Sequence, residues 1–111
     1  MLTPVAEITA ELQELVGQRA IAYATGLRST KPIVGWRTGS SKPHPETEDR
    51  LRSLYRAAIV LDRAFGPETV RAWMSGSNPD LGERVPLDLM HERDAQAVIA
   101  AAERFAEESA G

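Results

Sequence analysis

Apolar side chains recur every three or four residues along most of the chain, a spacing that places them on one face of an α-helix. A first helix is predicted to end at Gly17, since glycine commonly ends helices; its apolar residues are Val5, Ile8, Leu12, Leu15 and Val16. Two short helices are predicted next, over residues 18–24 and from Lys31 to Gly39, with a turn at Thr25-Gly26 between them.

The longest predicted helix follows the polar loop GSSKPH and ends before Gly66-Pro67; its apolar stripe is Leu51, Leu54, Tyr55, Ala58, Ile59 and Phe65. A short amphipathic segment, ETVRAWM, and a turn-rich link, SGSNPDLGERVP, then lead to a last helix with Val98, Ile99, Ala102, Phe105 and Ala106 facing inward. No segment alternates apolar and polar residues as a strand does, so the predicted fold class is all-α. We expect three parts, over residues 1–44, 45–65 and 66–111, of which the middle one is a connecting or dimerisation helix.

The length and composition are those of one small globular domain. The chain has 111 residues and no cysteine, which excludes disulfides, thiol nucleophiles and zinc sites built on cysteine. No apolar run approaches the roughly 20 residues that span a bilayer, so no membrane association is predicted. We therefore expect a cytoplasmic protein.

The charge is distributed unevenly along this acidic chain, whose formal net charge is −3. Residues 1–45 hold five basic and three acidic side chains, whereas residues 66–111 hold four basic and nine acidic ones. No acidic residue occurs between Leu15 and Pro45. The asymmetry indicates two surfaces with different partners, although a small acidic excess by itself only favours solubility.

Enzymatic motifs are missing from the sequence. His44 and His91 are the only histidines, and HERD lacks the second histidine of the zinc motif HExxH. GSSKP lacks the spacing of a phosphate-binding loop and has no strand before it. A Ser-His-Asp arrangement stays open only because these residue types occur in most chains. We predict no catalytic residue, no metal site and no cofactor, and we expect that the protein is not an enzyme.

The acid-free segment is typical of a helix-turn-helix. Ala22 lets two short helices approach and Gly26 takes the turn between them. The second helix would enter a major groove with its N-terminal end leading, where cations, hydroxyls and free N–H groups favour phosphate. The predicted DNA-binding residues are Arg28, Ser29, Thr30, Lys31, Arg37 and Lys42. Since one such unit binds weakly, a dimer that reads two half-sites is the natural form.

The alternative is that this helix pair is only a structural unit, because helix pairs with glycine turns are common. Leu27, Ile33 and Trp36 are then core residues rather than base contacts. Gly35 lowers the stability of the second helix by roughly 1 kcal/mol relative to alanine. It either permits close packing or lets a backbone approach.

The segment WMSGSNPDLGERVPLDLM, residues 73–90, is the most specific signal in the chain. Pro79, Gly82 and Pro86 define a compact connector that docks one helix on another. Its apolar residues either belong to the core or form an exposed patch that meets a partner.

The order of residues in this segment resembles the toxin-binding domain of the Xre/MbcA/ParS antitoxin family. The resemblance is carried by Trp73-Met74, Asn78, Leu81-Gly82 and residues 86–90, followed by a final helix. The first half, including VGWRTGSSKP and RLRSLYRAAIVL, resembles the Xre-like helix-turn-helix of that family. The similarity extends over residues 12–110.

The resemblance implies an antitoxin of a type II toxin–antitoxin pair. Its toxin would carry a RES domain that degrades NAD, and the antitoxin would cover the active-site entrance. Operator binding, a homodimer or a larger hetero-oligomer with the toxin are implied as well. The toxin-contact residues that it suggests are Trp73, Met74, Asn78, Leu81, Pro86, Leu87, Leu89, Met90, Arg104, Glu107 and Glu108.

Two alternatives remain open at this point. Glu107 and Glu108 either pair with cations of the toxin's NAD pocket or are solvated residues at a helix end. The whole chain is either an antitoxin or a stand-alone helix-turn-helix repressor with a helical dimerisation part.

Overall fold

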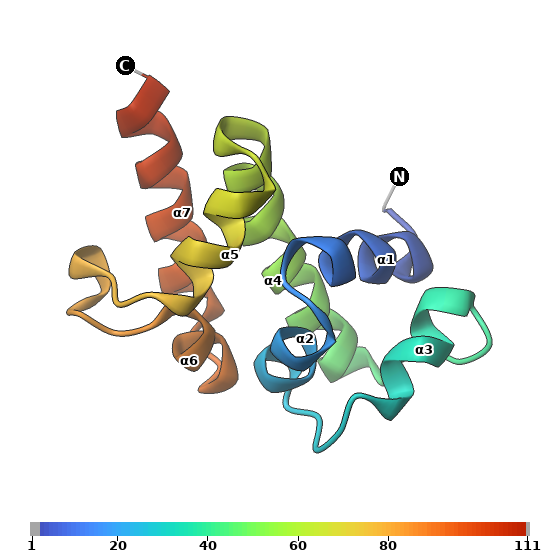
Figure 1. Ribbon diagram of the computed structural model, residues 1–111. Helices are drawn as coiled ribbons and strands as arrows, with labels where there is room; N and C mark the ends of the chain where they lie inside the picture. The colour runs from blue at the N-terminus through green and yellow to red at the C-terminus, as the bar shows by residue number, and fades with distance from the viewer. Residues whose placement is uncertain (1–2, 111) are drawn as a thin grey trace.

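The computed structural model describes residues 3–110 and consists almost entirely of helices (Figure 1). The helices are α1 (Val5–Leu15), α2 (Gln18–Thr25), α3 (Lys31–Thr38), α4 (Pro45–Phe65), α5 (Pro67–Ser75), α6 (Pro86–His91) and α7 (Ala95–Ala110), with a 3₁₀ turn η1 at Pro79–Leu81. No strand occurs within residues 3–110, where a single isolated bridge joins Asn78 to Arg84. The all-α prediction is confirmed.

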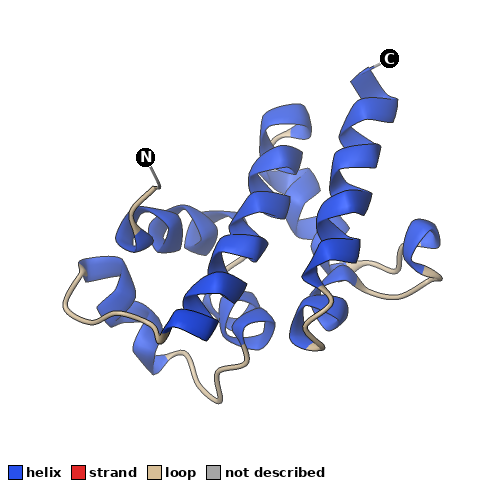
Figure 2. Cartoon of the chain, turned by 180° about the vertical axis from the view of Figure 1, so that it is seen from behind, coloured by secondary structure: helices blue, strands red, loops and turns tan. Residues whose placement is uncertain are grey.

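Helix α4 lies at the centre of the molecule and contributes to both halves. It packs against α1 and α2 and against α5 and, most extensively, α7. Figure 2 shows α4 and α7 running side by side over much of their length. Leu51, Leu54, Ala57, Ala58 and Leu61 of α4 are completely buried. One hydrophobic core therefore continues from the N-terminal half into the C-terminal half.

Helix α3 makes its main contact with only one other helix. It packs against α1, and its buried side chains are Ile33 and Trp36. Both were predicted as core residues, and Leu27, at the turn before α3, packs partly buried against the same core. The apolar face of this short helix therefore points into the protein, and its other face remains exposed.

The turn between α2 and α3 begins at Gly26, as predicted. Gly26 ends α2 with φ +83° in the left-handed region, which glycine adopts without strain. A Cβ on Gly26 would lie 2.5 Å from Nη1 of Arg50 on α4. Glycine is therefore needed at this turn for a second reason, which the sequence pattern does not show: the Arg50 guanidinium lies too close to leave room for a side chain.

Gly35 permits close packing, which was one of the two alternatives. A Cβ at this position would overlap Oγ of Ser41 and lie 3.2 Å from its Cβ. The backbone N–H of Ser41 also donates to the Gly35 carbonyl oxygen at 3.2 Å. The loop after α3 thus folds back on the middle of that helix.

Among the residues that the structure describes, no helix is both long and apolar enough to cross a membrane.

Candidate functional site

Four of the predicted DNA-binding residues lie together where α3 begins. Arg28, Ser29 and Lys31 are exposed, and Thr30 is half-buried. The backbone N–H of Lys31 donates to Oγ of Ser29 at 3.4 Å, so the serine hydroxyl takes up one of the free N–H groups of the helix start. Two cations and two hydroxyls therefore meet at the N-terminal end of α3.

The other two predicted DNA-binding residues are placed differently. Arg37 is half-buried, and its Nη1 donates to Oε1 of Gln13 on α1 at 2.5 Å. Lys42 is exposed in the loop beyond α3, where it lines a depression together with Glu48 of α4. In space, therefore, a glutamate of α4 and a lysine of the acid-free segment line the same depression.

The C-terminal half contains a groove that gathers several of the suggested toxin-contact residues. We call it the α5–α7 groove; its volume is about 320 Å³ and it is lined by Ala72, Trp73, Gly76, Ser77, Asn78, Pro79, Asp80, Phe105 and Glu108. Leu81 and Arg104 lie beside it, because η1 packs on α7 and Nε of Arg104 is 3.8 Å from Oδ2 of Asp80. Glu107 is exposed near the end of α7.

Most of the remaining suggested toxin-contact residues lie in the interior. Met74, Pro86, Leu89 and Met90 are buried in this chain's own core. Leu87 is half-buried on α6 and lines a separate cavity between α2, α5 and α6. The buried residues hold α5 and α6 in place. Trp73, Leu81 and the end of α7 are the suggested contact positions that stay accessible near the groove.

Asn78 fixes the connector that forms one wall of the groove. Its side-chain Oδ1 accepts the backbone N–H of Asp80 at 2.9 Å. Its carbonyl oxygen accepts the N–H groups of Leu81 and Glu83, and its own N–H donates to the carbonyl oxygen of Arg84. Because Asn78 bonds to the turn on both sides, this network stabilises the connector, and Asn78 also lines the groove.

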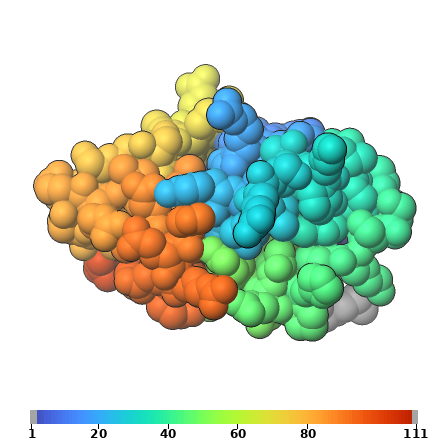
Figure 3. Space-filling view, turned by 90° about the horizontal axis from the view of Figure 1, so that it is seen from below, coloured from blue at the N-terminus to red at the C-terminus, as the bar shows by residue number. Residues whose placement is uncertain are grey.

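A polar contact between α2 and α6 joins the two halves, and no pattern in the sequence indicates it. Oη of Tyr23 donates to Oδ1 of Asp88 at 2.6 Å, which raises the pKa of the tyrosine. The Tyr23 ring stacks on the ring of His91, with centroids 4.3 Å apart, and the Tyr23 carbonyl oxygen accepts a hydrogen bond from His91 Nδ1 at 2.9 Å. Figure 3 shows the α2 and α6 segments, blue and orange, meeting on one face.

Arg50 strengthens the same junction from α4. Its Nη2 donates to the carbonyl oxygens of Met90 (3.3 Å) and His91 (2.8 Å) at the end of α6. Burial lowers the pKa of Arg50, and the nearby charge of Arg93 acts in the same direction. Since Arg50 also lies against Gly26, it connects the turn between α2 and α3 to the last turn of α6. The α6 carbonyl groups are 40 and 41 positions from Arg50 in the sequence, so no local spacing predicts these bonds.

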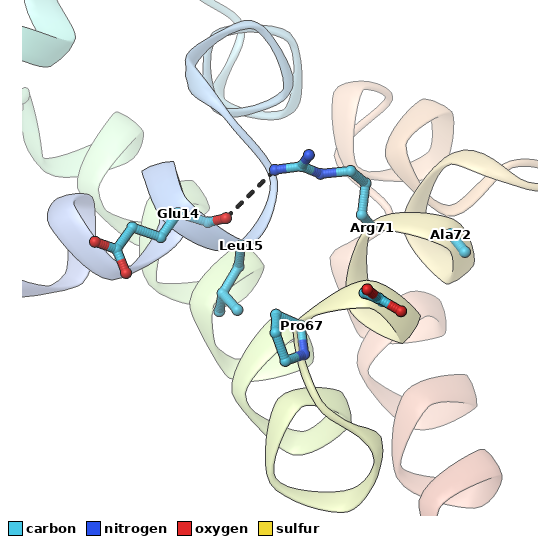
Figure 4. Close-up of a pocket in the computed structure, with 6 residues that line it drawn as sticks. Glu14, Leu15, Pro67, Arg71 and Ala72 are labelled. Atoms are coloured by element: carbon cyan, nitrogen blue, oxygen red, sulfur yellow. Dashed lines mark hydrogen bonds between the residues drawn. The ribbon is translucent and has the colours of Figure 1, made fainter.

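A further cavity of about 410 Å³ lies between the end of α1 and α5, and none of the predicted site residues lines it (Figure 4). Glu14, Leu15, Pro67, Glu68, Arg71 and Ala72 surround it. Nη2 of Arg71 donates to the Glu14 carbonyl oxygen at 3.3 Å across its edge. Within residues 3–110, no group of three or more histidine, aspartate or glutamate side chains forms a metal site.

Comparison with known proteins agrees with the C-terminal half of this description. Residues 57–104 match the family model of the antitoxin Xre/MbcA/ParS C-terminal toxin-binding domain. A probable mycobacterial cidal antitoxin of Mycobacterium tuberculosis is 34% identical over 77 residues, which are 69% of this chain and 65% of that protein. The aligned part thus spans just under two thirds of the relative's length.

The fold also matches a solved structure. A chain of the crystal structure of the M. tuberculosis MbcT–MbcA toxin–antitoxin complex superposes with a TM-score of 0.79, covering 96% of this chain and 97% of that one. The two sequences are 23% identical, so this match concerns the fold. From the matched domain, the related sequence and the shared helical fold, we conclude that the chain belongs to the Xre/MbcA-type antitoxin family.

Proposed function

We propose that this protein is the antitoxin of a toxin–antitoxin pair and that it inhibits a RES-domain, NAD-degrading toxin by covering its active site. The observation that carries the proposal is the position of the α5–α7 groove. The groove is built largely from the region that matches the toxin-binding domain, and the exposed acidic end of α7 lies beside it.

The accessible residues of this region suit a protein interface. Trp73 and Leu81 are half-buried apolar side chains next to the charged residues Arg104, Glu107 and Glu108. Interfaces commonly combine such an aromatic and apolar centre with a polar rim. Glu107 and Glu108 would meet the cations that a toxin uses to hold the pyrophosphate of NAD. Inhibition by coverage requires no catalytic residue from this chain.

A co-expression experiment tests the proposed function. The chain is produced together with a RES-domain toxin encoded beside its gene, and growth and cellular NAD are measured. We expect rescue by the natural chain and loss of rescue by the double variant Glu107→Lys/Glu108→Lys, because like charges would then face each other. Glu68→Lys, at an exposed position on α5 outside the α5–α7 groove, is the control and should still rescue. Failure of the natural chain to rescue contradicts the proposal.

We further propose that the protein binds the DNA upstream of its own gene as a dimer. Arg28 and Lys31 are exposed at the start of α3, the end that enters the major groove in helix-turn-helix proteins. Arg37 is held by Gln13, so it contributes through orientation of α3 or through contacts to the DNA backbone. This activity is also what the alternative of a stand-alone repressor requires.

The salt dependence of operator binding tests the DNA proposal and separates the alternatives. Arg28→Ala and Lys31→Ala should each weaken binding and reduce the slope of log affinity against log salt by about 0.9 for each phosphate that is no longer neutralised. Arg63→Ala, at an exposed position near the end of α4, should change neither quantity. An antitoxin should keep its rescue activity in the Arg28 and Lys31 variants. If operator binding is present and rescue is absent in the natural chain, the stand-alone repressor is correct.

A further inference from the structure

Two aromatic side chains line the α5–α7 groove. Trp73 of α5 and Phe105 of α7 face the groove, and both are half-buried. The Phe105 ring packs on Phe65 at the end of α4, with ring centroids 4.8 Å apart and planes tilted by 42°. Phe105 is therefore held in place, while its accessible part remains available to the groove.

The charged residues of the groove are both acidic. Asp80 and Glu108 line it, and no lysine or arginine does. Arg104 approaches Asp80 only at 3.8 Å, and both side chains are half exposed, so this pair neutralises Asp80 weakly. Glu108 forms no ion pair within the described part of the chain. An incoming cation would thus find one free carboxylate and one weakly paired carboxylate.

The connector that forms one wall of the groove is held by its own hydrogen bonds. Asn78 holds the backbone of Asp80 through its side chain, and further backbone bonds close the turn from Pro79 to Gly82. A site that is ordered before binding loses little conformational entropy when it is occupied. The groove is therefore preorganised on one side by the connector and on the other by the packing of Phe105.

We propose that the α5–α7 groove is the receptor for one arginine side chain of the toxin. That the arginine comes from the toxin rests on the proposed function. A guanidinium is planar, stacks on aromatic faces and donates to carboxylates in a fork. It therefore uses the Trp73 and Phe105 walls and the two carboxylates together. A lysine ammonium can reach the carboxylates and the ring faces, but it has no planar group to stack and no fork to pair with a carboxylate. An aliphatic side chain would leave both carboxylates partly desolvated without a partner.

Binding of small arginine probes tests the groove without any toxin. N-acetylarginine methylamide is titrated into the whole protein, and the indole N–H signal of Trp73 is followed by NMR. The buried indole ring of Trp36, the other tryptophan, serves as the internal reference. We expect a saturable shift of the Trp73 signal alone. The lysine analogue should bind more weakly, and the citrulline and leucine analogues, which lack the charge, should bind weakest.

Two adjacent carboxylates on α7 provide a matched pair of variants. Glu108→Gln removes the carboxylate that lines the groove, and Glu107→Gln removes an equal charge that does not. Glu108→Gln should weaken binding of the arginine probe about two- to fivefold, the range of an exposed ion pair. Glu107→Gln should leave it unchanged. Both substitutions are at exposed positions, so loss of folding does not complicate the comparison.

The outcomes separate this inference from the proposed function. Equal binding of the arginine and citrulline probes, stronger binding of the leucine probe, or equal effects of the two glutamine variants would overturn the arginine site. Rescue of growth would then still support the antitoxin. Selective arginine binding without any rescue would support the site and reject the RES-domain toxin as its partner. With both activities present, Glu108→Gln should also weaken the toxin complex more than Glu107→Gln. This is measured by titrating the toxin, freed of NAD, into each variant.

Discussion

Helices α3 and α7 carry the two proposed contact surfaces, but they are attached to the protein in different ways. Helix α3 packs mainly on α1 and buries only Ile33 and Trp36. Helix α7 packs along α4 and buries Val98, Ile99 and Ala102, all upstream of its acidic end. The position of α3 therefore depends on a few side chains, whereas the end of α7 can change its charge without affecting the core.

The two halves are nevertheless one structural unit. Tyr23 of α2 bonds and stacks with Asp88 and His91 of α6, and Arg50 of α4 bonds to the end of α6. Helix α3 directly follows α2, and α7 directly follows α6. The two proposed contact helices are therefore connected through the junction between α2 and α6. The following substitutions test how far the weak attachment of α3 and the strong attachment of α7 differ.

The largest expected effect follows from removing the main anchor of α3. Trp36→Ala should lower the free energy of unfolding by about 3–5 kcal/mol, the usual range for truncating a buried aromatic residue. Urea denaturation measures this loss. Val34→Ala, on the exposed face of the same helix, should stay within about 0.5 kcal/mol. Hydrogen exchange in Trp36→Ala should rise in α3 before it rises in α7. Equal acceleration in both helices would contradict the difference in attachment.

A smaller effect is expected at the turn that faces Arg50. Gly26→Ala combines a left-handed backbone, φ +83°, with a Cβ 2.5 Å from Nη1 of Arg50. Gly39→Ala is the matched control, because Gly39 ends α3 with φ +82° and no atom lies within 4 Å of its added Cβ. We expect a loss of about 1–2 kcal/mol for Gly39→Ala from the backbone alone.

Gly26→Ala should destabilise the protein by a further ~1 kcal/mol, because Arg50 must give up a hydrogen bond to the α6 carbonyl oxygens. Urea denaturation of both variants gives the difference. The excess should disappear in the Arg50→Ala background. If the two glycine variants lose equal stability, Arg50 moves aside freely and does not connect the halves.

Helix positions and their apolar faces could be predicted from the sequence, since periodicity is a local property. Helix α2 ends at Thr25, one residue after its predicted end, and α4 begins after the predicted loop. The residues at the start of α3 lie together because they are neighbours in the chain. Four consecutive positions at a helix start cannot be separated by folding.

Contacts between distant segments could not be predicted. Short helices such as α5 and α6 have too few turns to show which apolar residue faces inward, so the pattern did not distinguish Trp73 from Met74. In the structure, Met74 is buried and Trp73 borders the groove. The Arg37–Gln13 and Tyr23–Asp88 bonds join residues 24 and 65 positions apart, which no periodic pattern reports.

The smallest expected effect is a pH dependence that belongs to the N-terminal half. Oη of Tyr55 on α4 donates to Oε2 of Glu11 on α1 at 2.6 Å, and this bond, with burial, raises the pKa of Tyr55 to about 12. In the unfolded chain a tyrosine loses its proton near pH 10. Between pH 10 and 12 the folded state therefore binds more protons than the unfolded state, and stability falls as the pH rises.

The bond contributes fully below pH 10, and solvent screening limits the loss by pH 12 to about 1 kcal/mol because the pair is part-exposed. Urea denaturation at pH 9.5 and 11.5 should show a smaller decrease for Tyr55→Phe than for the natural chain, since phenylalanine has no proton to lose. Tyr23 is present in both proteins, so its own raised pKa cancels in the comparison. Hydrogen exchange at the higher pH, corrected for intrinsic rates, should rise more in α1 than in α7. An equal decrease in both proteins would show that the contact between α1 and α4 does not depend on this bond.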